Sequence, residues 1–171
     1  MILRRTIWKF EDAVFDGIAD KLVIPENPLA GAKAFTIEVV LCPGTGGEEE
    51  QRFLHIQGKD ECRALLELRA TPNGWYGDVF VHFNCGSKFL NDPELLHPFG
   101  EWAALALVYD GARLRQYVNG SLELEGPAPG GVLGHGTTAI GMRLNDVSPF
   151  KGRIAEIRFT PTALTRQFLS P

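Results

Sequence analysis

Hydrophobic and polar positions along the chain alternate in short runs separated by turn residues, which is the pattern of β-strands. In the run 79–85, every second residue from Val79 to Cys85 is apolar, so these side chains would share one face of a strand. The run 103–109 is apolar at successive positions, as expected of a central strand buried on both faces. The runs predicted as strands are 35–42, 52–57, 64–70, 79–85, 103–109, 113–118, 121–125, 137–144 and 153–159.

Turn residues separate these runs at short intervals. Asp110-Gly111 and Asn119-Gly120 each lie between two predicted strands, and such pairs favour type I′ hairpin turns, in which both central residues need a positive φ. They predict three consecutive antiparallel strands. A short helix is expected over residues 161–168, and no other stretch has clear helical periodicity. Many short strands with frequent turns predict an all-β sandwich or closed barrel.

Composition narrows the class of protein. A chain of 171 residues with a net charge of −4 is expected to form one domain over residues 1–171. The acidic balance gives no basic footprint for nucleic acid, and no run of about 18 apolar residues predicts a membrane span. Arg4 and Arg5 are followed by Lys9 and Glu11 instead of an apolar stretch, so no signal peptide is seen. We therefore expect a cytoplasmic protein, or a module without its export signal.

The three cysteines, Cys42, Cys62 and Cys85, form no Cys-x-x-Cys pair. Because cysteine is commonly buried, we expect free and mostly buried thiols in a reducing compartment. One disulfide plus a free thiol is the alternative.

A series of motifs runs from about residue 10 to the C-terminus. The motifs are AVFDG at 13–17, DKLVIP at 20–25, FTIE at 35–38, GEW at 100–102, LALVYDG at 105–111, LRQYVNG at 114–120, FKGRI at 150–154 and ALT at 163–165. In order and spacing the chain resembles the concanavalin A-like lectin/glucanase superfamily, in its laminin-G-like, pentraxin-like branch. The resemblance implies a jelly roll of two curved antiparallel sheets. It does not imply one function, because the family includes lectins, adhesion modules, glycosidases, lyases and scaffolds.

The resemblance also directs attention to two positions. Trp102 is expected to be a core anchor at the start of a strand. The closing strand of the family often carries a carboxylate that helps bind calcium, and Ala155 stands at that position here. Strand parity would turn Glu156 to the opposite face, which leaves Asp16 as a carboxylate near the rim. Calcium prefers six to eight oxygen ligands with carboxylates among them, so we expect no tightly bound metal.

Catalytic motifs of related folds are not found. Glucanases of this superfamily carry Glu-x-Asp-x-Glu on one strand, which places two carboxylates on the same face. This chain has only the consecutive Glu48-Glu49-Glu50, in a loop of glycine and polar residues that we expect to be solvated. The histidines are dispersed, so no zinc site is expected. We assign no catalytic residue, cofactor or metal.

A polar strand face is the first candidate for a binding surface. Glu67 and Arg69 share one face by parity, as do His82 and Asn84, and both pairs would point away from the apolar residues beside them. Related enzymes and some lectins hold sugars on such a face where the sheet is concave. The alternative is an ordinary solvated outer face, because antiparallel sheets commonly leave one face wet.

Aromatic side chains give the second candidate. Trp75 and Tyr76 follow the turn residues Asn73-Gly74, and exposed aromatics at a loop tip can stack on sugars or on a protein partner. The alternative is that they fold back over the edge of the sandwich. Tyr117 is expected on the far face of its own sheet, as a further ligand contact.

These observations favour a non-catalytic binding module that recognises a glycan or a protein through rim loops or the concave face. The first alternative is a polysaccharide lyase or glycosidase on the concave face that uses Glu67, Arg69 and His82, which would have to converge. The second is a structural or oligomerisation domain.

Overall fold

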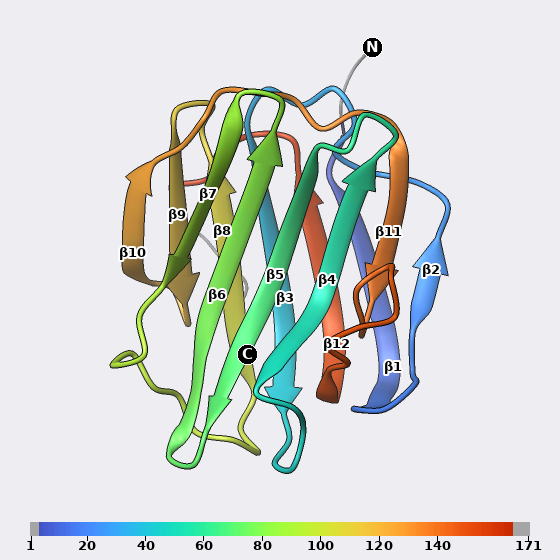
Figure 1. The fold of residues 1–171 in the computed structure, drawn as a ribbon, viewed down its shortest axis with the longest axis vertical. Helices are drawn as coiled ribbons and strands as arrows, with labels where there is room; N and C mark the ends of the chain where they lie inside the picture. The colour runs from blue at the N-terminus through green and yellow to red at the C-terminus, as the bar shows by residue number, and fades with distance from the viewer. Residues whose placement is uncertain (1–3, 166–171) are drawn as a thin grey trace.

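The computed structural model describes residues 4–165, which form two six-stranded antiparallel β-sheets packed face to face (Figure 1). Sheet A has the order β1 (Thr6–Asp16), β12 (Lys151–Thr160), β3 (Phe35–Pro43), β8 (Ala103–Tyr109), β9 (Arg113–Val118) and β10 (Ser121–Pro127). Sheet B has the order β2 (Leu22–Ile24), β11 (Gly136–Ile140), β4 (Glu50–Gly58), β5 (Arg63–Thr71), β6 (Gly74–Phe83) and β7 (Gly86–Asn91). The prediction of an all-β sandwich is confirmed.

The core lies between the sheets, where alternate residues of each strand point inward. In β6 the side chains of Val79, Val81 and Phe83 are buried in this core, as the alternation of 79–85 predicted. Strand β8 is buried along its whole length, which confirms its place near the centre of sheet A. Sheet B therefore turns the remaining residues of β4 to β7 outward, on the face nearest the viewer in Figure 1.

The predicted meander β8–β9–β10 is present, and its two turns differ. Asn119 and Gly120 have φ angles of 50° and 81°, as a type I′ turn requires. At the other turn only Gly111 has a positive φ, because the Asp110 carboxylate accepts hydrogen bonds from the backbone N–H groups that follow. The type I′ prediction is wrong for that turn.

Several strand predictions need correction. Strands β1, β2 and β7 were not predicted, because they are mixed in polarity or very short. The run 137–144 ends as a strand at Ile140, since Gly141 has a φ of 87° and the chain leaves the sheet there. Residues 161–165 are not helical, and the rest of the helix expected over 161–168 lies outside the described residues.

Trp102 is not a core anchor. Its side chain is only half-buried, and the Arg153 guanidinium lies 5.0 Å from its ring centroid. A cation–π contact at the surface therefore replaces the predicted burial.

All three cysteines are free, with Cys42 and Cys62 buried and Cys85 exposed, which agrees with the prediction of free and mostly buried thiols. Between residues 4 and 165 the structure has no helix long and apolar enough to span a membrane.

Candidate functional site

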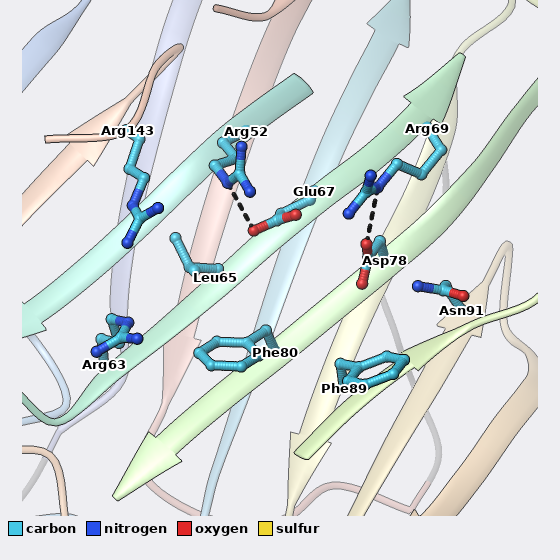
Figure 2. A pocket seen from close by; sticks show the side chains of 10 residues that line it. All are labelled: Arg52, Arg63, Leu65, Glu67, Arg69, Asp78, Phe80, Phe89, Asn91 and Arg143. Carbon is cyan, nitrogen blue, oxygen red and sulfur yellow. Dashed lines mark hydrogen bonds and ion pairs between the residues drawn. The ribbon is translucent and has the colours of Figure 1, made fainter. Parts of the chain in front are cut away.

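A pocket of about 360 Å³ opens on the outer face of sheet B. Strands β4 to β7 form its floor, and the loop that follows β11 forms one wall (Figure 2). Its lining is rich in charge and in aromatic rings and consists of Arg52, Arg63, Leu65, Glu67, Arg69, Asp78, Phe80, Phe89, Asn91 and Arg143.

The strand register arranges the outward side chains in rows across the sheet. Arg52, Glu67, Asp78 and Asn91 face one another in one row, one from each of β4 to β7. The next row contains His55, Leu65, Phe80 and Phe89. The polar row and the largely apolar row are neighbours, because successive outward residues of a strand are two positions apart.

A β-bulge at Phe53 sets which residues of β4 face the pocket. The pairing of β4 with β5 shifts between Arg52 and Leu54, so Phe53 and Leu54 are both buried in the core. Arg52 and His55 consequently lie on the outer face, although three positions separate them. Simple alternation would put them on opposite faces.

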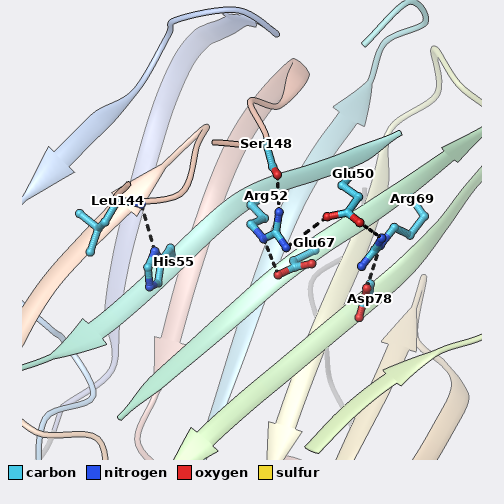
Figure 3. A network of polar contacts seen from close by, with 8 residues as sticks. All are labelled: Glu50, Arg52, His55, Glu67, Arg69, Asp78, Leu144 and Ser148. Atoms are coloured by element: carbon cyan, nitrogen blue, oxygen red, sulfur yellow. Dashed lines mark hydrogen bonds and ion pairs between the residues drawn. The ribbon is translucent and has the colours of Figure 1, made fainter. Parts of the chain in front are cut away.

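Ion pairs link the charged residues at one end of the pocket into a chain (Figure 3). Arg52 Nε lies 2.9 Å from Glu67 Oε1, and Arg69 Nε lies 2.9 Å from Asp78 Oδ2. Glu50 joins the two arginines, at 3.4 Å from Arg52 and 2.5 Å from Arg69. Glu50 is thus the first residue of β4 and an ion-pair partner, so the prediction of a loop is wrong for it, while its side chain is exposed as expected.

Burial perturbs the two carboxyl groups on the pocket floor. It raises the pKa of Glu67 to about 7, and the pKa of Asp78 is raised as well, against the opposing effect of the nearby arginines. Glu67 is only 4% exposed, so loss of hydration outweighs its ion pair with Arg52. Near neutral pH the pocket therefore carries less negative charge than its carboxyl groups alone indicate.

The loop between Gly141 and Phe150 carries Arg143 over the edge of the pocket. The N–H of Arg52 donates to the carbonyl of Ser148 at 2.9 Å, and the N–H of Leu144 donates to His55 Nδ1 at 3.1 Å. An N–H can only donate, so His55 is neutral with its proton on Nε2. Burial is the largest cause that lowers the pKa of His55 to about 4, followed by the charge of Arg143, and both favour this neutral ring.

Two of the four pocket arginines have no carboxylate partner among residues 4–165. The guanidinium of Arg63 lies over the Phe80 ring, 5.4 Å from its centroid, and its Nε is buried without a hydrogen-bond acceptor. Arg143 makes no side-chain hydrogen bond or ion pair within the same described range. Burial and the charges of Arg52 and Arg63 lower the pKa of Arg143, so these cations lie close enough to repel one another.

The structure brings together some of the predicted site residues. Glu67 and Arg69 both line the pocket, and they point away from the core as predicted. His82 lies on the same face outside the pocket, where its Nδ1 is 2.7 Å from Ser87 Oγ. Asn84 lies beyond the end of β6 in an exposed turn, so the prediction that it shares the strand face with His82 is wrong.

The predicted aromatic contacts are dispersed. Trp75 has no exposed surface and belongs to the core, so the prediction of an exposed ring is wrong for it. Tyr76 is half-buried and faces Arg69 across the strand pair. Tyr117 lies on β9 of sheet A and pairs with Ala106 and Leu122, so it belongs to the opposite sheet from the pocket.

The lyase or glycosidase alternative required Glu67, Arg69 and His82 to converge. His82 is four residues along β6 from Asp78, the partner of Glu67, which corresponds to roughly 13 Å of strand. Glu67 and Arg69 both line the pocket and His82 does not, so the three residues that this alternative required do not converge.

Most of the pocket lining was missed by sequence reasoning. Phe80 and Asp78 have the same parity as His82, so continuing the alternation backward through β6 would have placed them on the outer face. Phe89 belongs to an unpredicted strand. Arg143 has no sequence signal, because its position depends on how a loop folds onto β4.

The expectation of no tight calcium site can be tested at the rim. Oδ1 of Asp16 accepts hydrogen bonds from the N–H groups of Ile18, Ala19 and Asp20, and these bonds, with that from Ala19 the largest, lower the pKa of Asp16. Ala155 sits at a β-bulge, so parity fails there, and Glu156 pairs instead with Arg158 at 3.2 Å. A calcium ion would have to compete with these bonds at Asp16.

We expect the same melting temperature in millimolar calcium and in excess chelator, measured by differential scanning fluorimetry. A ligand bound only by the folded state at about 100 times its Kd would add about 2.7 kcal/mol, which is several degrees for a chain of this size. An upward shift of that size with calcium, absent with magnesium, would contradict the prediction.

A family profile described as the concanavalin A-like lectin/glucanases superfamily matches residues 16–169. A search of curated protein sequences gives no match. Among solved structures, a SAP-like pentraxin from Limulus polyphemus is 16% identical with a TM-score of 0.70, covering 95% of this chain and 78% of its own.

Two further solved structures are similar in fold. The CBM40 of the Ruminococcus gnavus IT-sialidase is 13% identical over 94% of both chains with a TM-score of 0.74, and it has also been solved bound to α2,3-sialyllactose. Domain 4 of an extracellular GH43 arabinanase from Geobacillus stearothermophilus, in complex with arabinotriose, is 19% identical with a TM-score of 0.62. That match covers 94% of this chain and 84% of the domain, and at such identities the likeness concerns the fold.

Proposed function

Since this chain belongs to the concanavalin A-like lectin/glucanases superfamily, we propose that it is a non-catalytic glycan-binding module whose ligand occupies the pocket on the outer face of sheet B. The observation that carries the proposal is the combination of a partly exposed aromatic surface and a fixed row of polar groups in one pocket. Ligand pockets typically pair an apolar lining with a few well-placed polar groups.

The aromatic row supplies a surface for a sugar ring. Phe89 is 60% exposed and lies opposite the half-buried Phe80, while Leu65 closes the floor between the strands. A pyranose ring has an apolar face formed by its C–H groups, and an aromatic side chain offers a flat apolar partner of similar size.

The polar row supplies hydrogen-bond partners for hydroxyl groups. Asp78 and Asn91 are paired across β6 and β7 and line the pocket beside the aromatic row. Because the ion pair between Arg69 and Asp78 holds the carboxylate in place, little side-chain entropy remains to be lost on binding. Both features support a ligand that has apolar and hydroxyl-bearing faces.

The solved relatives support the class of ligand. The Ruminococcus gnavus module was solved with sialyllactose and the arabinanase domain with arabinotriose, which are both oligosaccharides. We extend this class of ligand to the present chain as part of the proposal.

Binding should depend on Phe89. A glycan array followed by isothermal titration calorimetry is expected to identify an oligosaccharide whose affinity falls by at least about 10-fold in Phe89→Ala, because an exposed ring contributes by contact with the ligand. The matched control is Leu122→Ala, which removes a side chain that is 50% exposed on sheet A and should leave the affinity unchanged.

The outcomes separate the alternatives. Glycan binding that Phe89→Ala leaves intact would contradict the assignment of the pocket. Absence of any glycan ligand, with a protein captured reproducibly in a pull-down, would favour the protein-binding form of the module. Cleavage of the bound oligosaccharide, detected by mass spectrometry, would contradict the non-catalytic assignment.

A further inference from the structure

We propose that the pocket selects sugars that carry an acid group, and that this group binds between Arg63 and Arg143; the inference rests on the proposed function. The acid group is a carboxylate or a sulfate, since the planar guanidinium donates two parallel hydrogen bonds to either kind of oxyanion.

The arrangement of the arginines carries the inference. In Figure 2 the guanidinium groups of Arg52, Arg63 and Arg143 lie around Leu65 at one end of the pocket. Arg52 is already occupied, because it binds Glu67, Glu50 and the Ser148 hydroxyl. Arg63 and Arg143 form no ion pair within residues 4–165, although the charge of Glu67 acts on Arg143 from a distance.

The pocket leaves these two cations electrostatically unsatisfied. Burial and the neighbouring charges of Arg52 and Arg63 lower the pKa of Arg143 against the opposing charge of Glu67. The Nε of Arg63 is buried with no acceptor, and its Nη1 donates to the carbonyl of Glu61 at 3.4 Å. Both arginines are partly buried, and a cation that loses hydration without gaining an anionic partner is destabilised. An oxyanion from a ligand would supply the anion that these two cations lack.

The sheet register orients the whole sugar. Arg63 lies two residues before Leu65, the β5 residue of the aromatic row, so an acid group beside Arg63 leaves the ring over Phe80 and Phe89. Farther along the polar row, Asp78 and Asn91 lie on the side of the pocket away from Arg63 and Arg143, where they can bond to hydroxyls.

The experiment compares acidic and neutral oligosaccharides by calorimetric titration of the full chain. The acidic probes are α2,3-sialyllactose, trigalacturonic acid and 3′-sulfolactose, and the neutral probes are lactose and arabinotriose. We expect at least one acidic probe to bind about 10-fold or more tightly than either neutral probe. The stronger of the carboxylate and sulfate probes identifies the acid group.

Variants locate the acid group. Arg143→Gln and Arg63→Gln should each weaken the acidic probe by at least about 10-fold and weaken the neutral probes by a smaller factor, whereas Arg143→Lys should lose less because it keeps the charge. The control is Arg113→Gln, a 42% exposed arginine of sheet A, which should have no effect. An unfolding midpoint close to that of the wild type shows that a variant is folded. If Arg143→Gln does not fold, Arg143→Lys tests the site in its place.

The two proposals fail differently. If neutral probes bind as tightly as acidic ones and Phe89→Ala weakens both, the acid-group inference is overturned while the glycan-binding function stands. If acidic probes bind but both glutamine variants leave their affinity intact, the assignment to Arg63 and Arg143 is overturned. If no probe and no arrayed glycan binds, the proposed function fails, and the inference fails with it.

Discussion

Replacing Trp75 with alanine is expected to lower the free energy of unfolding by about 3–5 kcal/mol, the range measured for large aromatic residues in cores. Trp75 has no exposed surface, and its Nε1 donates to the carbonyl of Pro98 at 3.1 Å. Its backbone also exchanges two hydrogen bonds with His97, whose ring lies 4.9 Å away, so one residue fixes the segment after β7 to the sandwich. Urea denaturation followed by circular dichroism measures the change.

Tyr76 provides the neighbouring control. It is half-buried on the outer face, so Tyr76→Ala should cost about 1 kcal/mol or less. Trp75→Phe should recover part of the loss, because it keeps a ring in the core and removes the hydrogen bond to Pro98. Equal destabilisation by Trp75→Ala and Tyr76→Ala would contradict the burial of Trp75 as the cause.

The position of Trp75 illustrates why the predicted aromatic contacts do not lie together on one surface. The turn residues Asn73-Gly74 directed attention to a loop tip, yet Trp75 is already the second residue of β6. It has the same parity as Val79 and Val81, which face the core. Glycine and aspartate are both uncommon in strands, so Gly77 and Asp78 placed the start of the predicted strand at Val79 and left Trp75 outside it. Gly77 is there because a Cβ would lie 2.8 Å from Gln116 Nε2 in the opposite sheet.

The fold was predictable because its signals are local. Hairpin residues such as Asn119-Gly120 are adjacent in sequence, and an apolar strand such as β8 depends on its own residues. The resemblance of the motif order to the superfamily predicted in addition that the strands form two packed sheets. The edge strand β7 was not predicted, because one of its faces is solvated and the exposed Phe89 interrupts the alternation of polar and apolar residues.

The pocket depends on contacts between distant parts of the chain, which no local pattern encodes. Parity placed Glu67 and Arg69 together, and the structure agrees. Arg52 and His55 face outward together only because of the bulge at Phe53, and a bulge shifts parity without leaving a clear sequence mark. Arg143 reaches the pocket because its loop is hydrogen-bonded to β4. The three-dimensional structure is needed to identify such residues as part of the pocket.

Glu67 is expected to make the protein less stable as the pH rises. Its pKa is raised from 4.5 to about 7, so the folded state favours the protonated form. The stabilisation from this group is complete below the unfolded pKa of 4.5 and is lost as the pH rises through about 7. For a pKa difference of this size the loss is about 2 kcal/mol between roughly pH 5.5 and 8.5. Glu67→Gln removes the titration, so its stability relative to the wild type should rise by that amount over the interval.

His55 changes the free energy of unfolding with pH in the opposite direction to Glu67, so a variant is needed to separate the two effects. Its pKa is lowered from 6.5 to about 4, so its stabilisation is present above 6.5 and is lost as the pH falls through about 4. The two groups partly cancel in the wild type between about pH 4.5 and 6.5, and a single stability curve cannot separate them. The difference in unfolding free energy between Glu67→Gln and the wild type is measured by urea denaturation at about pH 5.5 and about pH 8.5. The change in this difference between the two pH values gives the contribution of Glu67 alone. A constant difference for Glu67→Gln would mean that the Arg52 ion pair outweighs burial and that Glu67 is ionised throughout.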